Sequence, residues 1–449
     1  MNKILIIGGS DAGISAALRI KEIDSKAEVT VIAADAFPNF SICGLPFYLS
    51  GEVADWRDLA HRTRDEIEQK GIGLRLDHQA LKIDSEMRKV RVRSTDSRTR
   101  QLGYDKLLIA TGAESVRPSI KGINTFGVFF LRWMADSFAI KRFMEQQNPR
   151  RAVIIGGGYI GLEMADALIR KGITVTLLES APEVLSTLST DLGKQIRAEL
   201  QSNGVQVITE QAVDRISRDK NEITVHAASG KIETADMVIV AAGAKPAIEL
   251  AQSTGIDIGV GNAIRVDRTM ATQVADIWAA GDCVVTWHRI LQRNVYLPLG
   301  TTAHKQGRVA GENMMGGNCE FQGSLGTQVV KVFDRVAART GLKASEAAEA
   351  GFDPLSVSLA LWDHKIYYPG AKELHVRITG DRSSGRLLGA QMVGHKKSEV
   401  SKRIDIFATA LYHSMAVKAL CDLDLSYTPP LSSPWDPLQM AAMSWCARQ

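Results

Sequence analysis

The sequence has few cysteines, and none of them are spaced as a pair. Five are scattered over 449 residues, an odd number with no CxxC motif. Disulfide scaffolds use even-numbered, closely spaced cysteines, and spacing-defined zinc sites use short cysteine or histidine pairs. Both classes are therefore excluded, no metal site is predicted, and the free thiols indicate a reducing compartment. The five are Cys43, Cys283, Cys319, Cys421 and Cys446.

Long hydrophobic runs and a strong charge of either sign are also missing. No stretch approaches the ~18 apolar residues of a membrane-spanning helix. The opening Met-Asn-Lys precedes only four apolar residues before a glycine, which indicates a buried strand rather than a signal peptide. The formal net charge of +4 does not indicate nucleic-acid binding but suits phosphate-bearing small molecules. We expect a soluble cytoplasmic protein of about two or three domains, with no membrane or nucleic-acid partner.

What the sequence does contain is a glycine-rich loop between an apolar strand and a helix near its start. Residues 4–7 form a buried strand, residues 8–13 read GGSDAG, and residues 14–23 have a helical pattern. Glycines let the backbone approach a pyrophosphate at the helix N-terminus, so this context predicts a dinucleotide site. Ser10 replaces the middle glycine, and Ala33 and Ala34 follow the strand 28–32 where an acid is expected. The predicted contacts are Gly8, Gly9, Ser10, Gly13 and, as a substitute acid, Asp35.

A second and cleaner copy of the pattern begins at residue 151. A strand over 151–155 leads into GGGYIG at 156–161, then a helix over 162–171 and a strand over 174–178. A generic glycine-rich turn is the alternative, but all three glycines and the terminal acid are present. That acid is followed by Ser-Ala-Pro-Glu without Arg or Lys, which favours NADH over NADPH. The predicted contacts are Gly156, Gly158, Gly161 and Glu179.

Further strand ends complete the arrangement of domains. Strands end at Thr111-Gly112, at Gly243 and at Gly281-Asp282, and residues 300–307 open a helix. This layout predicts an α/β fold with two Rossmann-like domains, the first interrupted by the second, and a C-terminal α+β domain. The predicted boundaries are 1–114 with 245–323 for the first, 115–244 for the second and 324–449 for the third.

These motifs together resemble the two-dinucleotide flavoprotein disulfide reductases over essentially the full chain. The resemblance implies FAD in the first domain and NADH in the second. It implies that Asp282 holds the flavin ribityl chain, and that a helix beginning near Thr302 and including Ala303 points its N-terminus at the flavin. Tyr159 would be a gate ring over the flavin where nicotinamide docks; the alternative is a surface aromatic beside a glycine loop.

Cys43 lies in the stretch NFSICGLPF at residues 39–47, before a short predicted helix. A helix N-terminus favours the thiolate, the form that attacks sulfur, although most free cysteines are simply small buried hydrophobes. Tyr48 stands where the glutathione-reductase branch has its second cysteine, so no internal disulfide forms. The context resembles the single-cysteine coenzyme A disulfide reductases and NADH-dependent persulfide reductases, apart from Asn39 where a serine is usual. It is less similar to the NADH oxidases and peroxidases, because Asp11 replaces their loop histidine.

The C-terminal part shows strand and helix patterns of its own. Apolar alternation over 327–333, 374–378 and 387–393 predicts an antiparallel sheet, and 402–412 predicts an amphipathic helix. The resemblance makes this part the dimerisation domain of a homodimer. It also implies that Tyr367 and Tyr427 approach the partner's cysteine as hydrogen-bond donors or proton sources; packing tyrosines beside prolines are the alternative.

The sequence therefore predicts an enzyme that uses FAD and NADH to reduce a low-molecular-weight disulfide, persulfide or polysulfide through Cys43. Coenzyme A is one candidate substrate, whose phosphates would need basic partners. Arg19, Lys21, Arg62 and Arg64 are candidates, although solvated helix faces look similar. We also expect no appended rhodanese-like domain after residue 449. Two alternatives remain: an NADH oxidase that cycles Cys43 through a sulfenic acid, and a flavin-bound redox sensor with little turnover.

Overall fold

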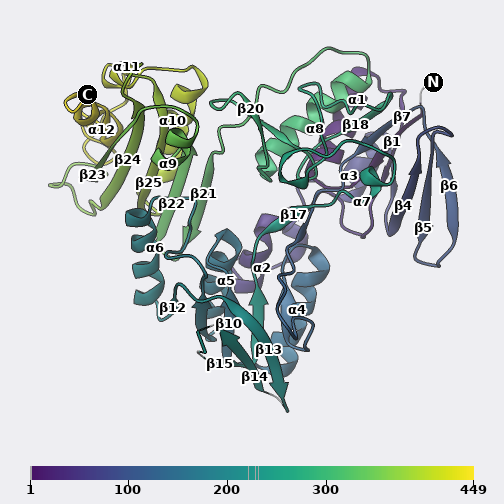
Figure 1. Ribbon diagram of the computed structural model, residues 1–449, viewed down its shortest axis with the longest axis horizontal. Coiled ribbons are helices and arrows are strands. Elements are labelled where there is room, and N and C mark those ends of the chain that lie inside the picture. The colour runs from purple at the N-terminus through teal and green to yellow at the C-terminus, as the bar shows by residue number, and fades with distance from the viewer. Residues whose placement is uncertain (1–2, 221, 228, 231) are drawn as a thin grey trace.

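The chain folds into three units, each centred on a five-stranded sheet, which Figure 1 shows as two upper lobes and one lower lobe. The computed structural model describes residues 3–220, 222–227, 229–230 and 232–449. Two of the sheets are parallel and the third, near the C-terminus, is antiparallel. The predicted α/β fold class is thereby confirmed. The exact domain boundaries remain a prediction.

The first sheet is parallel and contains the strand that precedes the first glycine loop. β1 pairs on one side with β2 and on the other with β7, so Ile7 lies beside both Ile32 and Ile109 at the carboxyl ends. α1 and α8 approach as closely as their backbones allow: a side-chain carbon at Gly307 would lie 2.1 Å from the Ala12 carbonyl oxygen. The elements are β3 (Ile72–Arg75), β2 (Glu28–Ile32), β1 (Lys3–Ile7), β7 (Lys106–Ile109) and β18 (Ile277–Ala279), with α1 (Asp11–Ile23) and α8 (Gly300–Met314).

The second sheet repeats this plan around β10, which precedes the second glycine loop. Its strands are parallel, and Ile155 lies beside Leu178 and Val240 at their carboxyl ends. The strands are almost entirely apolar, as expected for a parallel sheet buried on both faces. The elements are β12 (Gln206–Ile208), β11 (Thr174–Leu178), β10 (Arg151–Ile155), β16 (Met237–Val240) and β9 (Val128–Phe130), with α4 (Met134–Gln147), α5 (Tyr159–Arg170) and α6 (Thr190–Ser202).

Both helices after the glycine loops start earlier than predicted. α1 begins at Asp11 instead of residue 14, and α5 at Tyr159 instead of residue 162, because Ser10 and Gly158 are the N-cap residues. The last part of each loop is therefore the first helical turn. As a result, Asp11 and Tyr159 occupy equivalent first positions of their helices.

Shorter helices and strands connect the two parallel sheets or lie beside them. The chain crosses between the units twice, and the crossings run side by side as the antiparallel pair β8 and β17. The described elements here are η1 (Ile42–Gly44), α2 (Leu45–Ser50), η2 (Trp56–Leu59), α3 (Arg64–Gln69), β4 (His78–Asp84), β5 (Lys89–Ser94), β6 (Thr99–Gly103), β8 (Ala113–Ser115), β13 (Val213–Asp219), β14 (Glu222–Ala227), β15 (Ile232–Ala235), β17 (Ala244–Pro246), α7 (Glu249–Gln252), η3 (Val260–Asn262), β19 (Thr286–His288) and β20 (Arg293–Val295).

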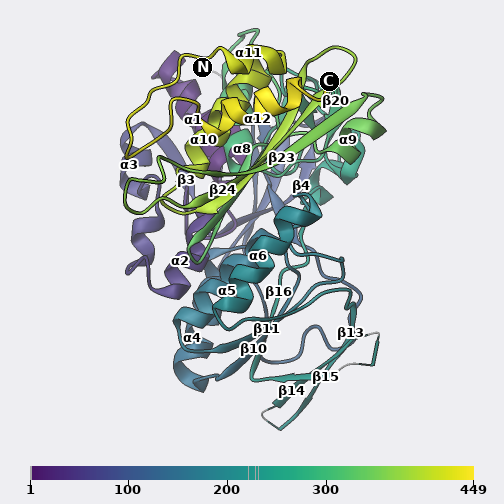
Figure 2. The ribbon, with the colours of Figure 1, turned by 90° about the vertical axis from the view of Figure 1, so that its left-hand side faces the viewer.

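The C-terminal unit is an antiparallel sheet in the order β21-β22-β25-β24-β23, with its last helices packed against it (Figure 2). The predicted antiparallel sheet is thus confirmed. Trp445 is fully buried and donates its ring N–H to the Leu355 carbonyl oxygen at 2.8 Å, which fastens the last helix to the edge strand. The elements are β21 (Gln328–Val332), β22 (Arg335–Gly341), α9 (Ala344–Glu349), β23 (Pro354–Trp362), β24 (Glu373–Asp381), β25 (Leu387–His395), α10 (Val400–Tyr412), α11 (Val417–Cys421) and α12 (Pro437–Cys446).

Lys331 of β21 joins all three units. Its ammonium lies 3.2 Å from the buried carboxylate of Asp166 on α5 and 3.3 Å from Glu52, which follows α2. Asp166 also accepts a hydrogen bond from the Phe333 backbone N–H at 2.9 Å. Among the described residues, no helix is both long enough and apolar enough to cross a bilayer.

Candidate active site

The first glycine loop has the backbone geometry that its motif predicts. Gly8 adopts a φ of 122°, and a side-chain carbon there would lie 2.0 Å from the Ala110 carbonyl oxygen. A side-chain carbon at Gly13 would lie 1.9 Å from the Gly8 carbonyl oxygen. Only glycine fits either position, so the turn from β1 into α1 is fixed and the N-terminal N–H groups of α1 are left open for a phosphate.

The second loop repeats the geometry, with an acid at its side. Gly156 has a φ of 108°, and a side-chain carbon at Gly161 would lie 1.9 Å from the Gly156 carbonyl oxygen. Gly158, in contrast, has no atom within 4 Å of its virtual side-chain carbon, so space for a ligand remains there. Glu179 accepts the backbone N–H groups of Gly157 at 2.6 Å and Ala181 at 2.7 Å, which holds its carboxylate beside the loop.

Buried polar atoms without hydrogen-bond partners gather around the first loop. They include both side-chain amide atoms of Asn39, Asp11 Oδ1, Arg132 Nε and the Tyr296 hydroxyl. Asn39 is only 1% exposed, adopts a φ of 57° and donates its backbone N–H to the Gly9 carbonyl oxygen at 2.8 Å. Unpaired buried polar groups are costly. Their presence beside a phosphate loop fits a bound dinucleotide such as FAD.

Several of the other predicted cofactor residues follow the carboxyl ends of strands in the first sheet. Asp282 follows β18 and pairs with Arg132 at 2.7 Å, both side chains being nearly buried. Thr111 donates its hydroxyl to the Ala247 carbonyl oxygen at 2.6 Å and so connects the two crossing strands. Asp35 accepts the Phe37 N–H at 3.1 Å, and burial raises the pKa of its carboxyl. Gly112, Gly243 and Gly281 all have positive φ angles, and Ala303 is buried in α8.

Cys43 lies in η1 on a loop that is held rigidly in place. The Ser41 backbone N–H bonds to the Leu59 carbonyl oxygen at 2.8 Å, and the His61 N–H bonds to that of Asn39 at 2.9 Å. The rings of Phe37, Phe40, Trp56 and Phe138 pack edge-on and stacked beside the loop. The following helix, α2, is buried against the unit that contains α5. The thiol is therefore fixed between the two nucleotide-binding units.

The expectation that a helix N-terminus holds Cys43 as thiolate is not supported. The Cys43 side chain is exposed, yet the protein packed around it raises the pKa of the thiol, and the carboxylates of Glu163 and Asp11 raise it further. α2 has only six residues and begins two positions later, at Leu45. Burial of the thiol, together with the surrounding negative charge, outweighs any stabilisation of the thiolate by so short a helix.

Glu163, one turn into α5, is a site residue that the sequence did not reveal. Burial raises the pKa of its carboxyl to about 7, with Lys331 lowering it and Asp166 raising it. A group with that pKa takes up and releases a proton near neutral pH. Nothing in the loop motif marks this position, and its effect on Cys43 comes from the packing of α2 against α5.

Tyr159, the predicted gate ring, is the first residue of α5. Its hydroxyl donates to the Gln328 side-chain oxygen at 2.5 Å and lies 3.2 Å from the Thr187 hydroxyl. Burial raises the pKa of the phenol. The ring is thus tethered at its far end to β21 of the C-terminal unit.

Tyr367 and Tyr427 lie together on the C-terminal unit, and both are exposed. The protein nearby raises the pKa of the Tyr367 phenol, as does its hydrogen bond with Tyr427. The same unit exposes an unusual number of large apolar side chains, a property typical of protein interfaces. They are Val329, Trp362, Ile366, Tyr367, Tyr368, Tyr412, Tyr427, Leu431, Trp435 and Met440.

The basic residues predicted to meet a substrate differ in how they are engaged. Arg19 pairs with Glu312 at 2.5 Å and with Glu22 at 2.8 Å. The Lys21 ammonium donates to the backbone carbonyl oxygens of Ser25 at 3.1 Å and Ala27 at 2.7 Å, so it supports the end of α1. Arg62 is exposed on the loop after Cys43.

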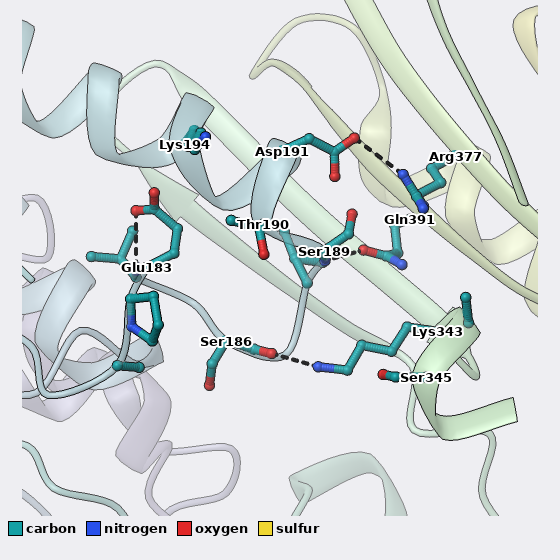
Figure 3. Close-up of a pocket in the computed structure, with 15 residues that line it drawn as sticks. Glu183, Ser186, Ser189, Thr190, Asp191, Lys194, Lys343, Ser345, Arg377 and Gln391 are labelled. Carbon is teal, nitrogen blue, oxygen red and sulfur yellow. Dashed lines mark hydrogen bonds and ion pairs between the residues drawn. The ribbon is translucent and has the colours of Figure 1, made fainter. Parts of the chain in front are cut away.

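A pocket of about 750 Å³ lies between α6 and the C-terminal sheet, and no predicted site residue lines it (Figure 3). Polar contacts between the two units border it. Lys343 donates to the Ser186 carbonyl oxygen at 2.8 Å, and Asp191 pairs with Arg377 at 3.2 Å. The Ser189 N–H bonds to Gln391 at 2.6 Å. These contacts fix the second unit against the third.

Comparison with known proteins agrees with this geometry. Residues 2–307 match the model for pyridine nucleotide-disulphide oxidoreductases, and residues 327–437 match the dimerisation domain of the same proteins. A protein of Pyrococcus horikoshii named NAD(P)H coenzyme A polysulfide/persulfide reductase is 34% identical over 98% of this chain and 97% of its own. A protein of Methanocaldococcus jannaschii named NADH oxidase is 31% identical over 98% of both chains.

A solved structure is similarly close. The NAD-dependent persulfide reductase from A. fulgidus superposes with a TM-score of 0.95 at 36% identity, over 99% of this chain and 83% of that one. The matches cover both nucleotide-binding units and the C-terminal unit. The chain belongs to the pyridine nucleotide-disulphide oxidoreductase family, whose members combine FAD and NAD(P)H in one protein.

Proposed function

We propose that this protein is an FAD-dependent NADH oxidoreductase that reduces a low-molecular-weight disulfide, persulfide or polysulfide through Cys43. The observation that carries the proposal is one exposed thiol on a fixed loop between the two nucleotide-binding units. Tyr48 occupies the position of a second cysteine and is buried, so Cys43 has no resolving thiol beside it. The sulfur that pairs with Cys43 is therefore brought by the substrate.

The protein's own part in the reaction follows from the chemistry of the thiol. The Cys43 thiolate attacks one sulfur of R–S–S–R′, forming a Cys43–S–S–R bond and releasing R′–S⁻, which takes up a proton. Two electrons and a proton then cleave that bond, returning the Cys43 thiolate and releasing R–SH. FAD, when bound, would accept hydride from NADH and would supply these two electrons. Glu163, with its pKa near 7, is placed to buffer the protons exchanged beside Cys43.

We propose that the hydride donor is NADH in preference to NADPH. The Glu179 carboxylate is held at the loop by two backbone N–H groups, and the next four residues include no lysine or arginine. A carboxylate accepts hydrogen bonds from a ribose hydroxyl and repels a 2′-phosphate. A kcat/KM for NADPH equal to that for NADH would contradict this preference.

We further propose a cytoplasmic homodimer in which Tyr367 and Tyr427 of one chain approach Cys43 of the other. Support comes from the dimerisation-domain match and from the exposed apolar side chains of this unit, which include both tyrosines. A phenol with a raised pKa retains its proton and donates a hydrogen bond to a departing thiolate. From the match of residues 2–307 to the oxidoreductase model, we also propose the predicted domain boundaries and the predicted roles of the glycine loops and Asp282.

The decisive experiment is anaerobic NADH titration of wild type and Cys43→Ser with coenzyme A disulfide, a coenzyme A persulfide and polysulfide as acceptors. Loss of acceptor reduction in Cys43→Ser, with NADH still reducing the flavin, is the expected result. Cys319→Ser, which removes another exposed thiol, is the matched control and retains the wild-type rate. Equal acceptor reduction by Cys43→Ser would overturn the proposal.

An NADH oxidase is the second candidate, because the relative from Methanocaldococcus jannaschii bears that name. Asp11 disfavours the oxidase function, because the oxidase branch that this chain resembles has a histidine at this position of the first glycine loop. Oxygen consumption by the purified enzyme separates the two functions. Rapid turnover of NADH with oxygen, and none with disulfides, would favour the oxidase.

A further inference from the structure

Two cysteines that the proposed reaction does not use lie together in the C-terminal unit. Cys421 is the last residue of α11 and Cys446 is the last residue of α12, and the two helices lie side by side (Figure 1 and Figure 2). The two thiols form a hydrogen bond with each other. Both are partly exposed, whereas Cys283 is buried. The pair is therefore accessible to a small reagent from solvent.

Both thiols line one pocket of about 450 Å³ at the surface of the unit. Lys418, Asp422, Met443 and Gln449 form the rest of its lining. That volume falls within the range of small-molecule sites. A low-molecular-weight disulfide can therefore enter the pocket and reach either sulfur.

A buried glutamine fastens the start of α12 to the end of α11. Gln439 is 4% exposed, and its side-chain amide donates to the carbonyl oxygen of Cys421 at 3.1 Å and to that of Leu423 at 2.8 Å. The last carbonyl groups of a helix have no partner within that helix. Gln439 satisfies one of them and so holds Cys421 in place against α12.

The far end of α12 meets α11 on the antiparallel sheet. A side-chain carbon at Gly380 of β24 would lie 2.6 Å from the Trp445 ring and 2.8 Å from the Val417 side chain. Val417 begins α11 and precedes Cys421 by four residues, so the two share one face of the helix. Trp445 directly precedes Cys446. The two thiols thus lie where the two helices converge on the sheet.

The two thiols have different roles in their hydrogen bond. Burial, and after it the neighbouring Cys446 sulfur, raise the pKa of the Cys421 thiol to about 11. Cys421 therefore keeps its proton at neutral pH and donates its S–H to the Cys446 sulfur. Since only a thiolate attacks a disulfide, Cys446 is the attacking group and Cys421 the thiol that resolves the intermediate.

We propose that Cys421 and Cys446 form a reversible disulfide by exchange with a low-molecular-weight disulfide, and that this bond cross-links the tail of the chain. The Cys446 thiolate attacks one sulfur of R–S–S–R, forming a Cys446–S–S–R bond and releasing R–S⁻. Cys421 then loses its proton, attacks the Cys446 sulfur and releases the second R–S⁻. The two cysteines have lost two electrons and two protons, and two molecules of R–SH have formed.

The bond would enclose residues 422–445, a segment that includes the exposed side chains of Tyr427, Leu431 and Trp435. A cross-link between the two ends of a segment restricts its conformations. Disulfides of reducing compartments are usually transient and respond to redox conditions. The bond therefore forms when low-molecular-weight disulfide accumulates and is lost when thiols prevail. It does not depend on the proposed function.

The bond is tested on the FAD-loaded enzyme without NADH, treated with glutathione disulfide at pH 8 and then with N-ethylmaleimide. Trypsin cuts after Lys418 and after Arg448 but nowhere between them, so one peptide, residues 419–448, contains both cysteines. In wild type this peptide should be lighter by two hydrogens, without glutathione, and should accept maleimide only after dithiothreitol. Cys319, exposed outside this unit, is the internal control and should end as a glutathione or maleimide adduct.

Single variants test the order of the two steps. Cys421→Ser should stop the exchange halfway and leave one glutathione on Cys446. Cys446→Ser should acquire glutathione on Cys421 at least about tenfold more slowly, because that thiol retains its proton. A wild-type peptide that keeps both thiols free, or that holds as much glutathione as Cys421→Ser does, would overturn the proposal.

The restraint on the tail is measured by amide hydrogen exchange of the oxidised and the dithiothreitol-reduced protein. Exchange within residues 422–445 should slow in oxidised wild type and should be equal in the two preparations of Cys421→Ser. Equal exchange in both states of wild type would refute the cross-linking of the tail.

Cys43→Ser separates this conclusion from the proposed function, since it should form the Cys421–Cys446 bond at the wild-type rate. If the bond forms but wild type reduces no disulfide, persulfide or polysulfide with NADH, the proposed function fails and the dithiol site stands. If wild type reduces these acceptors and the peptide 419–448 keeps both thiols free, the reverse holds.

Discussion

The two glycine loops share a backbone geometry but differ in the side chains beside it. In each, the last glycine lies so close to the first that a side-chain carbon would meet its carbonyl oxygen at 1.9 Å. At the first helical position the first loop has Asp11, whose charge reaches Cys43, and the second has Tyr159, tethered to Gln328. Directly after the strand that lies beside each loop, the first unit has Ala33 and the second unit has Glu179.

This difference shows which part of the motif is shared and which part is specialised. The glycines create the same turn and the same open helix N-terminus in both units, which suits a pyrophosphate of either cofactor. The flanking positions then direct one loop toward the thiol and the other toward the C-terminal unit. Variants of equivalent residues in the two loops test how far this division holds.

The largest effect is expected from the matched pair Gly13→Ala and Gly161→Ala. Forcing a side-chain carbon against a backbone carbonyl costs about 1–3 kcal/mol, enough to weaken cofactor binding about tenfold or more. Gly13→Ala is expected to lose FAD, measured by flavin absorbance after purification. Gly161→Ala is expected to keep FAD and lose reduction by NADH.

Gly158→Ala is the control for this pair, because no atom lies within 4 Å of its virtual side-chain carbon and its φ is −81°. Its melting temperature should match that of wild type. Simultaneous loss of both cofactors from either of the matched variants would show that the two loops are not independent.

The next effect concerns the charge that the second loop's helix brings to the thiol. Glu163→Gln removes a negative charge that raises the pKa of Cys43, so alkylation of Cys43 by iodoacetamide at pH 8 should quicken by up to about tenfold, one pKa unit. The ratio of variant to wild-type rate should fall toward one below pH 7, where Glu163 is protonated. A ratio independent of pH would contradict the assignment.

Glu163→Gln should also change the stability of the protein, and the sign of the change follows from the raised pKa of Glu163. The pKa of Glu163 is raised to about 7 in the folded protein, so the folded state holds its proton more tightly than the unfolded chain does. That contribution to stability is fully present below the unfolded pKa near 4.5 and is lost as the pH rises through about 7. The melting temperature of Glu163→Gln relative to wild type should therefore increase between pH 5 and pH 8.

A smaller effect on cofactor binding is expected from replacing the acid beside each loop, Glu179 in the second unit and Asp35 in the first. Glu179→Ala removes the carboxylate that we propose accepts a ribose hydroxyl of NADH and that two backbone N–H groups hold in place; hydrogen bonds to a charged group contribute about 1.5–3 kcal/mol. The KM for NADH should rise about tenfold. Asp35→Ala loses one such bond, from Phe37, and should retain most of its FAD. Equal loss of FAD and NADH affinity would show that Asp35 fully replaces the acid missing at Ala33.

The smallest effect is expected from Tyr159→Phe. It removes the hydroxyl bonds to Gln328 and Thr187, which contribute about 1 kcal/mol, and preserves the ring. The melting temperature should fall by a few degrees at most while kcat with NADH stays within about twofold. A large fall in kcat would show that the hydroxyl, and not the ring, acts at the flavin.

The fold was predictable to the extent that it depends on local sequence. Strand, glycine loop and helix lie next to one another in the chain, and glycine is required at positions 13 and 161 by the carbonyl oxygens of Gly8 and Gly156 in the same loops. The strands at 28–32, 151–155 and 174–178 match the structure. The helix starts were late by three residues because the last loop residues already adopt helical angles.

The surroundings of Cys43 were not predictable, because they come from distant segments. Glu163 is 120 positions from Cys43 in sequence, and its effect depends on α2 packing against α5. The thiolate expectation considered only the following helix and so gave the wrong direction for the pKa. Arg132 belongs to no motif, and only tertiary packing brings it to the site.

Through Lys331, a movement of one unit is coupled to the other two units, which none of the sheets achieves alone. The Lys331 ammonium forms ion pairs with α5 of the NAD(P)H-binding unit and with Glu52 behind the Cys43 helix, while its own strand begins the C-terminal sheet. A rotation of any one unit must stretch a contact to another at this point. The enzyme is therefore expected to open and close as a whole rather than by an independent hinge in one lobe.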